Sequence, residues 1–237
     1  MNMKLRRLSI PFLLACSASV PALAADFDVT VENLTRGVYF TPLVVAAHAE
    51  DTSLFMAGQA ASANLQAMAE GGDISGLEAD LTAIGATQSN NPAGGLLAPG
   101  ASATTTLNTD SAAANTQLTI AGMMLPTNDG FVAVNSLTIP TTAGEYTYYL
   151  NAYDAGTEAN DEIRGSGAAG EAGFPVPPPL EMTVGTGGTG LTATAEGYVH
   201  IHRGVLGDTD SSGGLSDISS TGHRWLNPVA KLTITVR

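Results

Sequence analysis

The sequence predicts an all-β protein with antiparallel strands and short helices inserted among the early strands. Apolar and polar residues alternate over 27–31 and again over 230–236, which is the pattern of half-buried strands. Glycine, alanine and threonine are abundant and lysine is scarce, a composition typical of turn-rich β proteins. Helical spacing is confined to residues 51–86, so helices should form only a small part of the fold.

Residues 1–24 predict a signal peptide: a basic start, an apolar core over 8–20 and a small-x-small cleavage site at Ala22 to Ala24. Cleavage would release a mature chain over 26–237, secreted or periplasmic. As an alternative, Leu13 to Cys16 resembles a bacterial lipobox, which would leave the protein lipid-anchored through Cys16. Elsewhere, no run approaches the eighteen or more apolar residues of a membrane span.

Composition limits how the mature chain can be stabilised and which partners it can bind. Cys16 is the only cysteine, so the mature chain cannot form disulfides and depends on core burial, for which about 210 residues in one domain suffice. The formal charge of −13 becomes −16 once Lys4, Arg6 and Arg7 are removed, because residues 1–24 contain no acid. Such a negative chain is a poor partner for nucleic acid or anionic membranes.

The elements follow from local patterns. Helical spacing predicts helices over 62–69 and 75–84, with Ser62 and Ser75 as N-caps and a Gly-Gly-Asp breaker at 71–73. Residues 164–197, rich in glycine and proline, predict a long surface loop that could cover the acidic cluster or bind a partner. Apolar, β-prone runs predict strands over 27–31, 38–47 with a bend at Pro42, 102–107, 117–123, 131–137, 145–153, 198–202 and 230–236.

Two acidic turns at the ends of neighbouring strands predict a metal site. Pairing strands 131–137 and 145–153 about a turn at residues 141–142 sets Asp129 opposite Asp154, and a slip of one or two residues leaves both at one end. Glu158 lies close by in sequence, and Asn128 and Asp161 are possible additional ligands. Calcium takes six to eight such oxygen ligands. Equally, acids and amides form turns at strand ends without any metal.

Three motifs carry a family resemblance: Pro-Thr-Asn-Asp-Gly-Phe-Val at 126–132, Tyr-Asp-Ala-Gly-Thr-Glu at 153–158 and Asn-Pro-Val-Ala-Lys-Leu-Thr-Ile at 227–234. They resemble the spondin N-terminal domain family of animal matrix proteins and secreted bacterial proteins. The resemblance implies an antiparallel β-sandwich with bound calcium, and a role in adhesion or matrix interaction. It carries the calcium ligands over to Asp129, Asp154 and Glu158, although the last position here is Glu where the animal proteins have Asp.

Histidines offer a different metal site. His200 and His202 alternate along a predicted strand and therefore point to the same face, where a pair can bind zinc or copper if a third ligand converges. His48 or His223 could supply that ligand, although nothing in the sequence places either nearby. His48 at a strand end, and the pair itself on the polar face of a sheet, also have an ordinary structural interpretation as hydrogen-bonding residues. The run from Asp208 to Gly213 begins like a calcium loop, but Ser219 stands where the bidentate Glu should be, which favours a variable loop.

Motifs for catalysis do not occur in the sequence. It has no nucleophile elbow, no phosphate loop, no dinucleotide fingerprint and no cysteine in the mature chain. A glycosidase needs a shielded proton-donating carboxyl, usually in an aromatic groove, and the chain has a single tryptophan. We therefore expect a non-enzymatic module that binds an unidentified extracellular protein, glycan or lipid.

Overall fold

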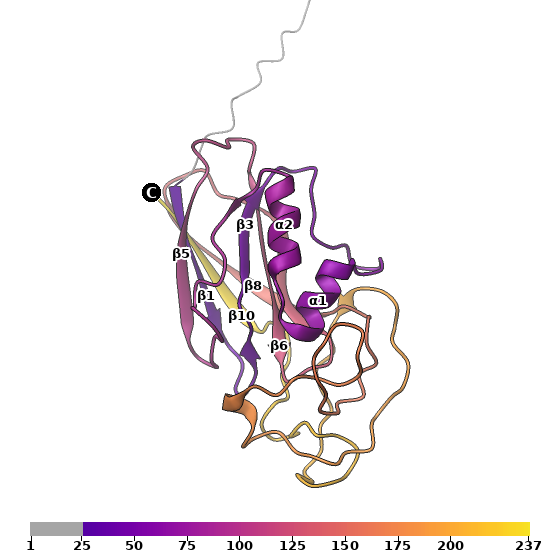
Figure 1. The fold of residues 1–237 in the computed structure, drawn as a ribbon. Helices are drawn as coiled ribbons and strands as arrows, with labels where there is room; N and C mark the ends of the chain where they lie inside the picture. The colour runs from indigo at the N-terminus through magenta and orange to yellow at the C-terminus, as the bar shows by residue number, and fades with distance from the viewer. Residues whose placement is uncertain (1–25) are drawn as a thin grey trace, which may run out of the picture.

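A computed structural model describes residues 26–237 (Figure 1). The predicted signal peptide over 1–24 and the lipid-anchor alternative at Cys16 lie outside the described residues. The strands are β1 (Asp26–Asn33), β2 (Tyr39–Phe40), β3 (Val44–His48), β4 (Thr87–Gln88), β5 (Ser102–Asn108), β6 (Gln117–Leu125), β7 (Gly130–Thr138), β8 (Gly144–Asp154), β9 (His200–Ile201) and β10 (Ala230–Val236). The helices are α1 (Ala63–Gly71), α2 (Ser75–Ala83) and the 3₁₀ turn η1 (Pro178–Leu180).

The strands form one antiparallel sheet in the order β4-β3-β6-β7-β8-β10-β1-β5, with β2 on β6 and β9 on β8. The sheet curls, so that its two ends approach each other: the side chains of Ser89, just after β4, and Thr105, in β5, share a hydrogen bond. Strands β1, β10 and β5 thus form one layer beside the layer of β3 and β6 (Figure 1). The all-β antiparallel prediction is confirmed.

The predicted central hairpin forms only at its open end. Strands β7 and β8 pair over 130–133 and 151–154, whereas residues 144–150 of β8 pair with β10. A bulge explains the separation: Thr119 of β6 faces two residues of β7, and Ser136 has a positive φ of 56°. The bulge bends β7 away from β8 near the turn, which frees that half of β8 for β10.

Both predicted helices form, but one predicted cap is wrong. The Ser62 side chain accepts a hydrogen bond from the Leu65 amide at 3.1 Å and caps α1. Ser75 is instead the first residue of α2, and its amide donates to the Asp73 carboxylate at 2.9 Å. Asp73 competes successfully because an Asx side chain binds the amide two residues on.

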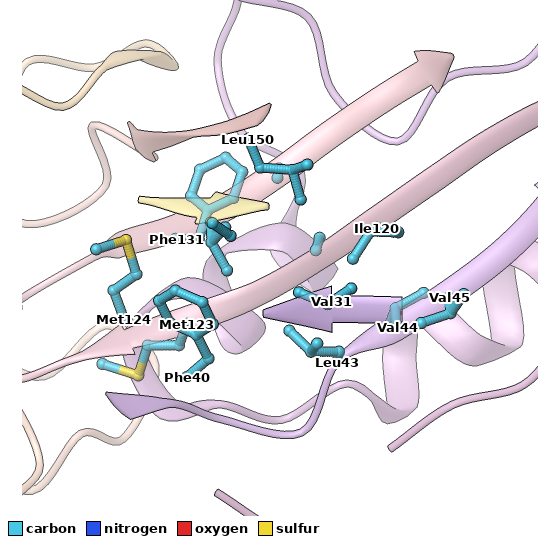
Figure 2. Close-up of a cluster of buried hydrophobic side chains, with 14 of the residues drawn as sticks. Val31, Phe40, Leu43, Val44, Val45, Ile120, Met123, Met124, Phe131 and Leu150 are labelled. Atoms are coloured by element: carbon cyan, nitrogen blue, oxygen red, sulfur yellow. The ribbon is translucent and has the colours of Figure 1, made fainter. Parts of the chain in front are cut away.

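Apolar side chains from both layers and from the helices form the core. Figure 2 shows Val31, Phe40, Ile120, Phe131 and Leu150 converging from different strands. The two methionines at 123 and 124, predicted to be core or hairpin-entry residues, are fully buried. Pro42 separates β2 from β3, as the predicted bend requires.

The Gly- and Pro-rich segment 164–197 is more than a surface excursion. It has little regular structure beyond η1, yet Phe174 and Leu180 are buried in the core. Glycine and proline removed the periodicity by which these anchors could have been recognised in the sequence. Within 26–237, no helix is long and apolar enough to cross a membrane.

Candidate metal centre

A tight turn between β6 and β7 positions Asp129. The Thr127 hydroxyl donates to the carbonyl of Met124 at 2.6 Å and accepts from the Gly130 amide at 3.0 Å. The carbonyl of Asp129 accepts from the Ala155 amide at 3.1 Å, which ties the turn to the end of β8. Gly130, rather than Asp129, pairs with Asp154, so the register differs by one residue and both acids remain at the same end.

Asp129 is a buried carboxyl group with one unused oxygen. Its Oδ2 accepts from the amides of Thr157 at 2.8 Å and Glu158 at 3.1 Å, whereas its Oδ1 has no hydrogen-bond partner. Burial, followed by repulsion from Asp154, raises the pKa of Asp129 to about 8. Both effects disfavour the ionised carboxylate, and both would weaken if a cation lay beside it.

Glu158 lies beneath the Gly-rich segment, next to two further predicted ligands. Asn128 Nδ2 donates to Glu158 Oε1 and to Asp161 Oδ1, each at 2.7 Å. The Gly173 amide also donates to Glu158 Oε1, so the 164–197 segment does cover this cluster. Glu158 Oε2 has no partner, and burial raises the pKa of this carboxyl group.

Gly156 allows a second segment to reach the acids. Its φ is +67°, and a Cβ there would lie 2.3 Å from the carbonyl oxygen of Tyr198. The Gly197 amide donates to the Gly156 carbonyl at 2.8 Å, and β9 then pairs with β8, His200 opposite Asp154. Only glycine permits this approach, which delivers residues 196–202 to the end of β8.

The imidazole rings of both predicted histidines lie near the Asp154 carboxylate. His200 Nε2 lies 3.7 Å from Asp154 Oδ1, and His202 Nε2 lies 3.8 Å from Oδ2. Asp154 also accepts from the Gly156 amide and from Asn160 Nδ2, both at 2.8 Å. Burial lowers the pKa of His202 to about 4, so this imidazole is neutral at pH 7.

Glu196 completes this side of the centre, and no motif or spacing pointed to it as a ligand. Ligand atoms of Asp154, Glu196 and His200 all lie within 4.8 Å of one another. These residues and His202 line a cavity of about 430 Å³. Within 26–237, six buried side-chain polar atoms lack a hydrogen-bond partner, and four belong to this centre: Asp129 Oδ1, Glu158 Oε2, Glu196 Oε2 and His202 Nε2.

The acids predicted as calcium ligands are neighbours in one network rather than a closed cage. Of the described residues, Asp129 and Glu158 do not belong to a group of three or more potential ligands within 4.8 Å of one another. Asp154, Asn128 and Asp161 join them through the hydrogen bonds and charges given above. Asp154 is therefore shared by the acidic network and the histidine cavity.

His48, His223 and Asp208 form hydrogen bonds within their own parts of the fold. His48 bonds Thr119 Oγ1 through Nε2 and Thr52 Oγ1 through Nδ1, each at 2.7 Å, while His223 Nδ1 accepts from the Ser219 amide. Asp208 accepts from the amides of residues 210, 215 and 216, which stabilises its own loop.

Comparison with known proteins shows to which family the chain belongs. A search of curated proteins finds no similar sequence. The family model described as Spondin_N matches residues 31–164, more than half of the chain, including two of the three motifs and the turns that carry Asp129 and Asp154. The third motif, at 227–234, lies beyond the match and leads into β10, which belongs to the same sheet. The chain belongs to the spondin N-terminal domain family.

Proposed function

We propose that this protein is an exported, non-catalytic module that binds calcium through Asp129, Asp154 and Glu158 and acts in adhesion or matrix interaction. The observation that carries the proposal is the burial of Asp129 beside Asp154, with Asp129 Oδ1 left unpaired. A buried polar oxygen without a partner is costly, and natural proteins rarely keep one without a reason.

The charges around Asp129 support a cation there. The side-chain charges that act most strongly on its carboxyl group are those of Asp154 and Glu158, and both are negative. Repulsion between closely placed carboxylates opposes ionisation unless a positive ion lies among them. A divalent cation would reverse this repulsion and join the turn before β7 to the turn after β8.

The donor set matches a hard cation. Asp129 Oδ1 and Glu158 Oε2 are unoccupied carboxylate oxygens, and Asp154 is oriented by Gly156 and Asn160. Asp161 lies beside them, whereas Asn128 turns its Nδ2 towards Glu158 and Asp161 and uses its Oδ1 to accept from the Glu162 amide at 3.0 Å, so it would have to reorient to become a ligand. Calcium prefers such oxygen ligands and tolerates flexible geometry, so modest side-chain movement would suffice.

Family membership and the predicted leader support the proposal of adhesion and export, on which the site itself does not bear. The negative surface charge leaves an extracellular protein, a glycan or a lipid as partner classes. The acidic network contains no activated nucleophile, which supports a binding rather than a catalytic role.

Thermal unfolding in excess calcium, in chelator and in magnesium tests the proposal. Calcium binding to the native state alone should add about 2.7 kcal/mol at a hundredfold excess over the dissociation constant. Asp129→Asn should abolish the calcium-selective rise in Tm, whereas the exposed control Asp51→Asn should retain it. An equal response in chelator and calcium would reject calcium binding.

A further inference from the structure

The cavity beside Asp154 presents a donor set that differs in kind from the acidic network. Oxygen atoms of Asp154 and Glu196 and a ring nitrogen of His200 all lie within 4.8 Å of one another. Calcium takes oxygen ligands, whereas a mixed set of imidazole nitrogen and carboxylate oxygen suits zinc and its neighbours. Of the described residues, Asp129 and Glu158 do not line this cavity.

The hydrogen bonds of His200 leave the correct nitrogen free for a metal. His200 Nδ1 lies 3.1 Å from the carbonyl oxygen of Ile201, which can only accept, so Nδ1 carries the proton and donates it. Nε2 therefore has its lone pair directed into the cavity, 3.7 Å from Asp154 Oδ1. Metal-binding histidines characteristically donate their other ring N–H to an acceptor of this type.

His202 provides an independent indication of a ligand. Its side chain is only 3% exposed, and the Gly204 amide donates to Nδ1 at 3.0 Å, so the neutral ring carries its proton on Nε2. That buried N–H has no acceptor within hydrogen-bond distance and points towards Asp154 Oδ2, 3.8 Å away. An oxygen ligand on an ion held by Asp154 would accept a hydrogen bond from this N–H.

The other two acidic residues of the cavity differ in whether their carboxylate oxygens are available to bind an ion. Glu196 Oε2 is buried without a partner and can bind an ion. Glu162, which also lines the cavity, accepts from the amides of Leu206 and Gly207 and from Ser216 Oγ, so both of its oxygens are occupied. Glu196 Oε2 and His200 Nε2 are therefore free, while each oxygen of Asp154 accepts one hydrogen bond, from the Gly156 amide or from Asn160 Nδ2, and keeps a second lone pair for an ion.

We propose that Asp154, Glu196 and His200 bind a divalent transition-metal ion of the zinc class, with a fourth position open to the cavity. Donors around a tetrahedral zinc ion lie about 3.4 Å apart, close to the 3.7 Å between His200 Nε2 and Asp154 Oδ1. His202 is a positioning residue, which orients Asp154 or a metal-bound water. This site shares Asp154 with the proposed calcium site but depends on neither Asp129 nor Glu158.

Metal titration of the tag-free, chelator-stripped protein tests the assignment. Calorimetry with Zn²⁺ should give one ion per chain, and Co²⁺ should produce visible ligand-field absorption that Zn²⁺ displaces. His200→Gln and Glu196→Gln should each weaken Zn²⁺ binding by more than about tenfold. Glu171→Gln makes the same chemical change at an exposed position of the same Gly-rich segment and should leave the affinity unchanged.

Circular dichroism melts establish that each variant is folded before its affinity is compared. Both substituted side chains are partly exposed, so folding should be retained. Unchanged Zn²⁺ affinity in both variants, or no stoichiometric binding by the wild-type protein, would overturn the assignment. The calcium proposal fails separately: Asp129→Asn reports on the calcium response, and His200→Gln reports on the zinc site alone.

Discussion

The raised pKa of Asp129 predicts that the metal-free protein loses stability as the pH rises. The folded state holds the Asp129 proton up to about pH 8, whereas the unfolded chain releases it near 3.8. The stabilisation that the protonated Asp129 gives the folded state is therefore complete below pH 3.8 and is lost as the pH rises through 8. Each pH unit between these values lowers the free energy of unfolding by about 1.4 kcal/mol.

The interval from pH 6.5 to 8 separates this effect from that of the histidines whose pKa is lowered, His202 and His223. His202, with its pKa lowered to about 4 from 6.5, adds stability as the pH rises from 4 to 6.5 and is neutral in both states above that. Between pH 6.5 and 8, Asp129 should therefore lower the free energy of unfolding by about 2 kcal/mol. Glu158, whose pKa is also raised, acts in the same direction.

Urea unfolding in chelator, followed by the fluorescence of the single, buried Trp225, measures the loss. Asp129→Asn should flatten the pH dependence relative to wild type, because the amide does not titrate. Calcium should flatten it in the wild type, because a bound cation favours the ionised carboxylate. Parallel pH profiles for wild type and Asp129→Asn in chelator would refute the reasoning.

Three further predictions concern stability. Ser62→Ala should cost about 1 kcal/mol in urea unfolding by removing the cap of α1, while Ser75→Ala should change stability by less than about 0.5 kcal/mol; equal losses would contradict the cap assignment. Leu232→Ala, at a fully buried position of β10, should cost about 2–5 kcal/mol, against almost nothing for Leu226→Ala at 85% exposure, and a similar cost at both sites would contradict the packing. Deleting residues 230–237 should abolish cooperative melting; a soluble, cooperatively melting product would refute the need for β10.

Alternating sequence patterns predicted β1 and β10 well because each half-buried strand shows its own periodicity. The strand predicted over 230–236 has the bounds of β10, and the run 27–31 lies inside β1. The strand predicted over 198–202 is shorter in the structure, where β9 covers only His200–Ile201. Pairing between strands was harder to predict. The bulge opposite Thr119 comes from tertiary packing, and it redirects half of β8 to β10, which lies far away in the sequence.

The candidate site was predictable only where its residues flank a local hairpin. Asp129 and Asp154 lie at the ends of strands joined by one turn, so simple register reasoning brought them together. Glu196 belongs to a Gly-rich segment without periodicity, and it reaches Asp154 only because Gly156 accommodates the backbone of Tyr198. Such a contact depends on three-dimensional packing, which no spacing of residues in the sequence reveals.

The position of β10 has a consequence for how the chain folds. Strand β10 lies between β8 and β1, so the layer formed by β1 and β5 can join the rest of the sheet on that side only after residues 230–236 have been synthesised. Pairs between residues so far apart in sequence are slow to form, because the intervening chain must first be ordered. The nascent protein should therefore stay open until late in synthesis.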